Sequence, residues 1–233
     1  MDISNYMFLK VILCSALFSA TAHAGENEWK ALNDQVMPQL QSGAFKQAEQ
    51  LARDSIQEAE KSFGAAHPNT AMSVSNLALV LRLQKRFEES EKLYRRTLAI
   101  RDKALGAAHP TTALTMLNLA DVLQAQKKYA EAEKLQRTVL PLFEKIHGED
   151  TKTATALNNL GANLLSQARH KEAEPYLRRA LAMKEKVLGA MSPSVAHTLN
   201  NLAEVCESLG RKDEAAKHRA RAVEIQKQVS AKA

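Results

Sequence analysis

Cysteine is scarce in this chain, because Cys14 and Cys206 are the only two among 233 residues. Cys14 lies in an N-terminal segment that we expect to be removed, so we expect no disulfide within the folded chain. Aromatic residues are also few, at 5% of the chain, whereas 45% of the residues are hydrophobic. The core must therefore be built mainly from small and aliphatic side chains, and the abundant Ala, Leu, Glu, Lys and Gln favour helices.

Signals of β-structure and of catalysis are missing as well. No run of Val, Ile or Thr alternates with polar residues, and no Asn-Gly or Asp-Gly dipeptide marks a hairpin. The chain has no Walker-type glycine loop, no Gly-x-Ser-x-Gly elbow and no His-Glu-x-x-His pair. We therefore expect an all-α protein that is not an enzyme and has no catalytic residues, no metal site and no cofactor.

The first 24 residues differ from the rest of the chain. Lys10 precedes an apolar run over residues 11–20, and Ala22 and Ala24 supply the small side chains that a signal peptidase requires. The run is shorter than the roughly 20 residues that span a bilayer. Residues 1–24 are thus predicted to be a signal peptide of an exported protein, periplasmic or secreted and bacterial, with an uncleaved membrane anchor as the alternative.

A segment that recurs every 42 residues dominates the remaining sequence. Residues 64–105 and 106–147 are identical at 21 of 42 positions, and Gly-Ala-Ala-His-Pro opens both. Such internal repetition indicates a stack of similar modules. We expect a solenoid over residues 25–233. Its five predicted repeats are 26–66, 67–108, 109–149, 150–191 and 192–229.

Each repeat is predicted to form two antiparallel helices. In the second repeat, His67 and Pro68 suit the cap and the first position of a helix, and apolar residues at three- and four-residue spacing follow over 71–81. A second apolar stripe covers 87–105, and Gly106 is placed to close that helix in a left-handed conformation. Neither helix buries its stripe alone, so the pairs must stack.

Three further positions carry expectations about packing. Aromatic residues recur at the start of the second helices and should fill the space between helices; they are Phe45, Phe87 and Tyr129. Cys206 occupies the repeat position that leucine holds elsewhere, which predicts a buried, inert thiol. In the last repeat, His218 and Arg219 replace apolar residues, which predicts a terminal helix that faces water.

The repeats resemble the tetratricopeptide repeats, and among them the 42-residue variety of kinesin light chains. Four segments carry the resemblance: His109-Pro110-x-Thr112-Ala113, Leu157-Asn158-Asn159-Leu160, Tyr129-x-Glu131-Ala132-Glu133 and Lys171-Glu-Ala-Glu-Pro175. It covers roughly residues 44–229. The resemblance implies a right-handed superhelical solenoid of antiparallel helix pairs that binds peptides or proteins.

We place ligand binding in the concave groove that this architecture implies. Its predicted positions lie two before, two after and five after the repeated leucine of each first helix. They are Ser75, Leu79, Arg82, Leu117, Asp121, Gln124, Asn158, Ala162, Leu165, Asn200, Glu204 and Glu207. The amides of Asn158 and Asn200 can pair with the backbone of an extended peptide. The asparagines one before the leucine either bond between repeats or contact the ligand; they are Asn76, Asn118, Asn159 and Asn201.

We expect a non-enzymatic scaffold that binds a protein or peptide segment. A structural component of an envelope assembly or secretion complex, and an accessory subunit of an enzyme, are the alternatives. The formal net charge is +6, but basic residues are interspersed with acidic ones, as in Lys184-Glu185-Lys186. We therefore expect no nucleic-acid partner, and contact with a membrane only through an uncleaved N-terminal segment.

Overall fold

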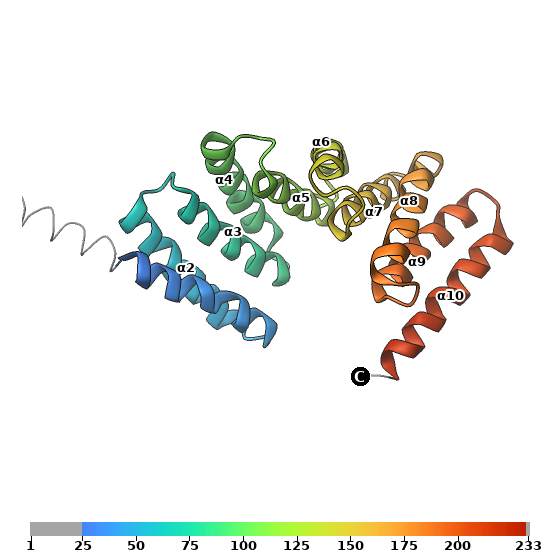
Figure 1. The fold of residues 1–233 in the computed structure, drawn as a ribbon, viewed down its shortest axis with the longest axis horizontal. Coiled ribbons are helices and arrows are strands. Elements are labelled where there is room, and N and C mark those ends of the chain that lie inside the picture. Colours follow the sequence, from blue (N-terminus) through green and yellow to red (C-terminus); the bar gives the residue numbers. More distant parts are fainter. Residues whose placement is uncertain (1–24, 232–233) are drawn as a thin grey trace, which may run out of the picture. The chain divides into compact units, whose positions relative to one another are not determined.

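The computed structural model describes residues 25–231, which contain helices and no strand (Figure 1). The predicted signal peptide lies outside the described residues. A helical segment over residues 25–41 comes first. The helices that follow are α2 (Phe45–Phe63), α3 (Pro68–Leu83), α4 (Phe87–Leu105), α5 (Pro110–Ala125), α6 (Tyr129–His147), α7 (Thr151–Ser166), α8 (His170–Leu188), α9 (Pro193–Ser208) and α10 (Lys212–Ser230). The predicted all-α fold class is confirmed, and none of the described helices carries an apolar stretch long enough to cross a bilayer.

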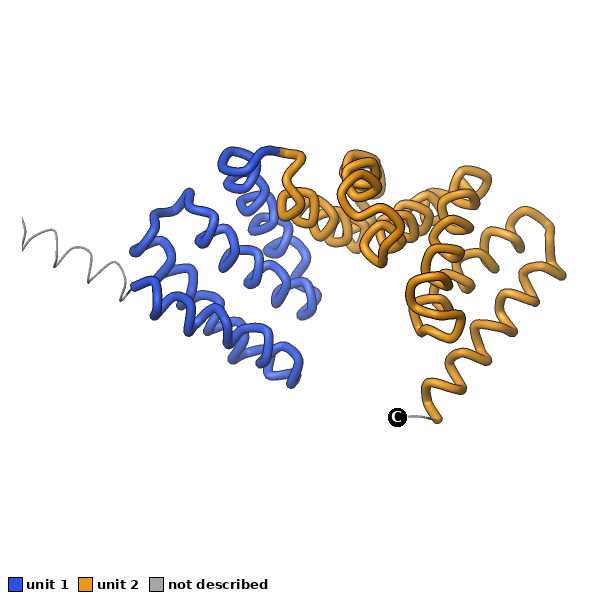
Figure 2. The backbone as a smooth tube through the Cα atoms, in the orientation of Figure 1, with its two compact units in different colours: residues 1–106 blue, residues 107–233 orange. Residues whose placement is uncertain are grey.

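The described residues form two compact units, which fall within residues 1–106 and 107–233 of the chain (Figure 2). In unit 1, α2 packs on α3 and α3 on α4. Trp29 ties the helical segment 25–41 to this unit, because its Nε1 donates a hydrogen bond of 2.8 Å to Oγ of Ser73. Unit 1 is therefore held together by helix packing and by a buried indole.

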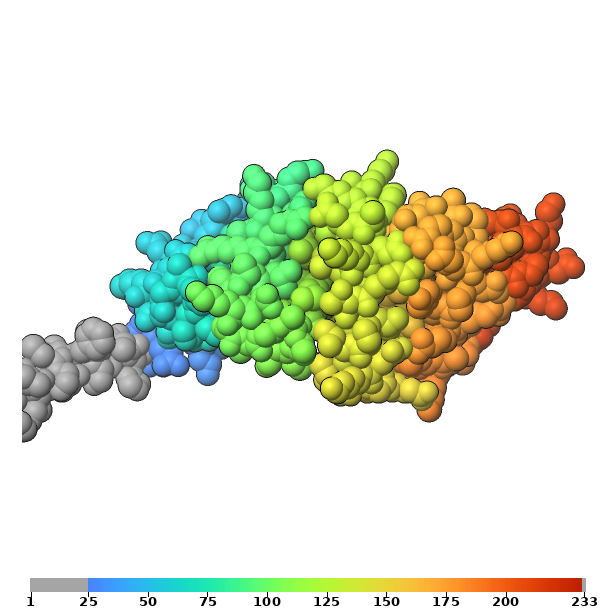
Figure 3. Space-filling view, turned by 90° about the horizontal axis from the view of Figure 1, so that it is seen from above, coloured from blue at the N-terminus to red at the C-terminus, as the bar shows by residue number. Residues whose placement is uncertain are grey.

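Unit 2 contains three helix pairs, in which each helix from α5 to α10 packs on the next. The first helices of these pairs also contact one another, α5 with α7 and α7 with α9. Figure 3 shows the segments of this unit following one another in chain order, from yellow-green to red. Packing of consecutive helix pairs confirms the tetratricopeptide solenoid as the fold class.

The predicted helix caps form as hydrogen bonds. Nδ1 of His67 accepts a bond of 3.1 Å from the backbone N–H of Asn69, and the same contact recurs at the start of α5. Asp150 caps α7 through a bond of 2.8 Å from the N–H of Thr153. Gly106 adopts a positive φ of 87°, but its ψ of 157° is extended, so the predicted left-handed helical conformation is wrong at this residue.

The short turns inside the helix pairs have a feature that the sequence pattern did not indicate. Lys85, Lys127 and Ala168 have φ values of 62°, 61° and 58°, where Gly43 and Gly210 stand in the corresponding turns. A side chain in the left-handed region costs roughly 1–2 kcal/mol per residue. Three of the turns are therefore strained in a way that glycine would relieve.

The prediction for the aromatic residues is wrong for Phe45. Its side chain is 39% exposed, and Phe87 and Tyr129 are only half-buried, because these residues stand at the very start of the second helices. The largest fully buried side chains are instead those of Tyr94 and Phe143, from the middle and end of their helices. Aromatic packing thus occurs deeper along the second helices than the sequence suggested.

Candidate functional site

The exposed predicted groove positions gather on α9. Asn200, Glu204 and Glu207 are exposed there, while Asp121 and Gln124 on α5 are half-buried. The half-buried positions elsewhere are Ser75, Leu79, Arg82, Asn118 and Ala162. Positions four residues apart on a helix share a face, so an amide and a carboxylate of α9 lie together on its accessible side.

Three predicted groove residues are buried. Leu117, Asn158 and Leu165 have exposed fractions of 6%, 5% and 8%. Oδ1 of Asn158 accepts a hydrogen bond of 2.9 Å from Oγ1 of Thr198, and a longer one of 3.4 Å from Nδ2 of Asn201. The acceptor oxygen of Asn158 is therefore used inside the protein.

The recurring asparagines bond between successive first helices. Nδ2 of Asn76 donates to Oδ1 of Asn33 at 2.8 Å, and Nδ2 of Asn159 donates to Oδ1 of Asp121 at 2.9 Å. The bond of Asn201 to the preceding first helix follows the same pattern. These amides fix the register of one helix pair on the next, and whether any of them also touches a ligand stays a prediction.

A pocket of about 320 Å³ lies next to the exposed face of α9. Asn200 and His197 line it from α9, and Gln226 and Val229 line it from α10. Of the residues that line this pocket, only Asn200 is a predicted groove position. The residues of α10 were missed because the groove was sought on first helices alone.

The carboxylates of α9 differ in their partners. Glu207 forms an ion pair with Arg219, whose hydrogen bond lowers the pKa of this carboxyl. Glu204 forms no ion pair with the described residues. Arg219 thus pairs directly with Glu207 and also interacts with Glu204 through space, so Glu204 is the carboxylate of this face that has no ion-pair contact with a described residue.

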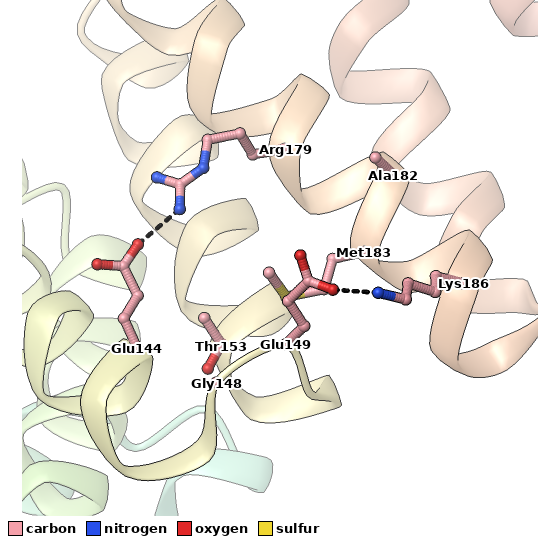
Figure 4. Close-up of a pocket in the computed structure, with 8 residues that line it drawn as sticks. All are labelled: Glu144, Gly148, Glu149, Thr153, Arg179, Ala182, Met183 and Lys186. Atoms are coloured by element: carbon pink, nitrogen blue, oxygen red, sulfur yellow. Dashed lines mark hydrogen bonds and ion pairs between the residues drawn. The ribbon is translucent and has the colours of Figure 1, made fainter.

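A second and larger pocket, of about 490 Å³, lies where the connection between α6 and α7 meets α8 (Figure 4). Arg179 bonds to Glu144 at 2.7 Å on one side of it, and Lys186 pairs with Glu149 on the other. Both cations are thereby matched by acids of the preceding helix pair. This pocket contains none of the predicted groove residues.

In both units, a half-buried carboxylate on one second helix forms an ion pair with an arginine of the next helix pair. In unit 1, Arg53 donates to Glu49 at 2.7 Å, and Arg86 reaches the same carboxylate from the next helix pair at 2.8 Å. Desolvation raises the pKa of Glu49, but hydrogen bonds from Arg53, Gln84 and Arg86 outweigh it and lower this pKa to about 2. Glu133 and its arginines repeat the arrangement in unit 2. Arg86 and Arg169 thus connect one helix pair to the preceding one.

Lys184 belongs to a short run of mixed charges in the sequence, Lys184-Glu185-Lys186, but its side chain is buried. Its exposed fraction is 3%, and Nζ donates to Oγ1 of Thr198 at 2.9 Å and to the carbonyl of Ser194 at 3.3 Å. Burial lowers the pKa of this amine to about 8. No pocket described above includes Lys184, so its contacts make it a link between α8 and α9.

Comparison with known proteins adds a family and several structures of similar fold. No curated protein matches the chain in sequence. The nearly identical TPR-like repeats of a Podosopora anserina kinesin light chain share 20% identity, with a TM-score of 0.74 over 87% of this chain and 96% of theirs. BtubC (BKLC) from P. vanneervenii shares 23% identity, with a TM-score of 0.76 over 92% and 90%.

A Rap protein complexed with Competence and Sporulation Factor is also similar, at 18% identity and a TM-score of 0.69 over 85% of this chain and 53% of its own. Likeness at these identities shows the fold alone. The sequence pattern described as Tetratricopeptide repeat matches residues 39–103, 72–145, 111–186 and 152–228. Because these four matches together span most of the sequence, the chain belongs to the tetratricopeptide repeat family.

Proposed function

We propose that this protein is an exported, non-enzymatic scaffold that binds a protein or peptide segment on the accessible face of α9. Proteins of the tetratricopeptide repeat family generally mediate protein–protein interactions and are generally non-enzymatic. The signal-peptide features of residues 1–24 support export to a bacterial periplasm or beyond.

One observation carries the proposal. Asn158, Asn159 and Asn201 are bonded between helix pairs, whereas Asn200 and Glu204 are exposed one helical turn apart on α9, and Asn200 also lines the α9–α10 pocket. An amide offers both a donor and an acceptor to the backbone of an extended segment, and a carboxylate without an ion pair attracts a basic side chain. The face therefore suits an extended segment that carries Lys or Arg.

The similar Rap structure supports the proposal at the level of the fold. That protein was solved as a complex with Competence and Sporulation Factor, so a solenoid of this kind is able to hold a ligand. The residues that would do so here are argued only from the exposed side chains of this chain.

Photo-crosslinking in cells tests the binding face. A photoreactive residue at Asn200 is compared with one at Lys171, which is exposed on α8, and adducts are identified by mass spectrometry. We expect one protein partner to be captured from Asn200 and not from Lys171. Capture from Lys171 alone would favour a permanent assembly that uses the second helices, and adducts at neither position would contradict the proposal.

Export has its own test. Cell fractionation, with immunoblotting against the C-terminal end of the chain, should place the protein outside the cytoplasm with residues 1–24 removed. Retention in the cytoplasm with the full length intact would contradict the exported part of the proposal and leave the binding face to be judged separately.

A further inference from the structure

Three side chains of metal-ligating type meet between the last two helices. Cys206 comes from α9, and Glu214 and His218 stand one turn apart on α10. One ligand atom of each lies within 4.8 Å of the others, and Nε2 of His218 is 3.6 Å from Oε1 of Glu214. Ligand atoms of a tetrahedral zinc site lie about 3.3–3.8 Å apart when metal–ligand distances are about 2.0–2.3 Å. Small side-chain movements would therefore complete a three-ligand set.

The imidazole of His218 is not a solvent-exposed group. Its side chain is 17% exposed, and its Nε2 is buried without a hydrogen-bond partner among the described residues. The expectation that His218 faces water is thus wrong for the nitrogen that points to the cluster. A buried polar atom without a partner costs free energy, and a coordinated cation would remove that cost.

Comparison of equivalent repeat positions shows that the Cys206 and His218 side chains occur together in the last helix pair, where the pairs formed by α3 to α8 have apolar or aromatic residues. Cys206 occupies the position of Leu81, Leu123 and Leu164, and His218 occupies that of Leu93, Leu135 and Tyr176. Two neighbouring apolar or aromatic positions have therefore changed together to a thiol and an imidazole. A need for a soluble end cannot account for this pair, since Cys206 is fully buried.

The surrounding charges set the conditions for a cation. Arg178 and Arg211 both contact the carboxylate of Glu214 and also that of Glu174. With the sulfur of Cys206 as a thiolate, three anionic groups would face two guanidinium groups. The net charge of these five groups is −1. The electrostatic repulsion of a divalent cation is therefore weaker than it would be from the two guanidinium groups alone.

We propose that Cys206, Glu214 and His218 bind a zinc ion, or a similar borderline divalent cation, between α9 and α10. A thiolate, an imidazole and a carboxylate are ligands that Zn²⁺ accepts together, with water in the fourth position. The ion would join the last two helices and stabilise the C-terminal end of unit 2. Binding displaces the thiol proton, so the affinity rises with pH.

Titration of the untagged, metal-free chain with Zn²⁺, in competition with a chromogenic chelator, tests the site. Two variants, C206L and H218L, restore the leucine that other repeats carry, so their helices are expected to pack. We expect one Zn²⁺ per chain for the unmodified protein and an affinity at least about 10-fold weaker in either variant, by analogy with losses at zinc sites. K217L, which changes an exposed residue of α10, should bind Zn²⁺ as the unmodified protein does.

Substitution by Co²⁺ gives an independent readout. Coordination by Cys206 should produce a sulfur-to-cobalt charge-transfer band that is absent in C206L and in C206S, the latter being the fallback if leucine disturbs folding. Circular dichroism melts should show a higher Tm with Zn²⁺ only where the cluster is intact. Equal Zn²⁺ affinity in all variants, or a Co²⁺ spectrum without the sulfur band, would overturn the proposal whether or not a protein ligand binds α9.

Discussion

Replacement of Lys184 by methionine should make the protein more stable at neutral pH. Lys184 is 3% exposed, and among the described residues its amine donates hydrogen bonds to Thr198 and to the carbonyl of Ser194 and forms no ion pair. Burial lowers its pKa from 10.5 to about 8. Each pKa unit corresponds to about 1.4 kcal/mol, so the folded state carries a penalty of at most about 3.5 kcal/mol for holding this charge.

The net gain in K184M is smaller than that limit. Methionine keeps the length of the lysine stem and fills the same space, but the variant loses the two hydrogen bonds of the amine. Thr198 still donates to Oδ1 of Asn158 at 2.9 Å, so no buried hydroxyl is left without an acceptor. We therefore expect K184M to raise the free energy of unfolding by about 1–2 kcal/mol at pH 7.

The pH dependence distinguishes this cause from better packing. Below pH 8 the amine is charged in both states, and the penalty is complete. Between pH 8 and 10.5 the unfolded chain keeps the proton and the folded chain releases it, so the stability contributed by Lys184 rises with pH. The advantage of K184M over the unmodified protein should thus shrink over this range and become a small disadvantage near pH 10.5, because only the cost of the two lost hydrogen bonds then remains.

Urea unfolding followed by far-ultraviolet circular dichroism at pH 7, 8, 9 and 10.5 measures the effect. K171M, at an exposed position of α8, controls for the methionine and should change stability by less than about 0.5 kcal/mol. If K184M were less stable at pH 7, or if its advantage stayed constant with pH, the reasoning on the buried charge would be refuted.

Three further changes test other features of the fold. G161A should lower the free energy of unfolding by about 1 kcal/mol in urea titrations. The added Cβ would lie 2.6 Å from Cγ of the buried Leu177, and the free energy cost of this clash exceeds the gain in helix propensity. An unchanged urea midpoint would contradict this. A168G should raise Tm modestly, with a gain of about 0.5–1 kcal/mol, since φ is 58° at this turn; a lower Tm would mean that the turn is not strained. E49Q should lower the free energy of unfolding by about 1 kcal/mol at pH 7, after allowance for solvent screening. This difference should vanish as the pH falls from 4.5 to 2, because the pKa of Glu49 is lowered in the folded state. A difference in stability that persists at pH 2 would argue against the Arg86 contact as its cause.

The helices and their caps could be predicted because their causes are local. The apolar spacing over residues 71–81 and the His67–Pro68 cap involve side chains within one or two turns of each other, and the structure places α3 at Pro68–Leu83. The same holds for the position of Gly106 after α4, although its ψ differs from the expected value. Repetition then made each such prediction apply to several helix pairs at once.

The candidate site could be predicted only in part. The count of residues from the repeated leucine selected Asn158 and Asn200 as equivalents, yet the first is 5% exposed and the second is exposed. Asn158 differs because Thr198 and Asn201, on the first helix of the next pair, donate hydrogen bonds to its Oδ1. Register along one helix cannot reveal which neighbour covers a given side chain.

The amino-acid sequence by itself determined the helical class, the repeat period and the helix starts of this protein, because propensity, periodicity and capping act over a few residues. Only the tertiary structure decided that Lys184 is buried and that Cys206 lies within reach of His218. Those outcomes depend on how each helix is rotated about its axis and set against the next one. Packing of whole faces fixes that rotation, and a one-dimensional pattern does not record it.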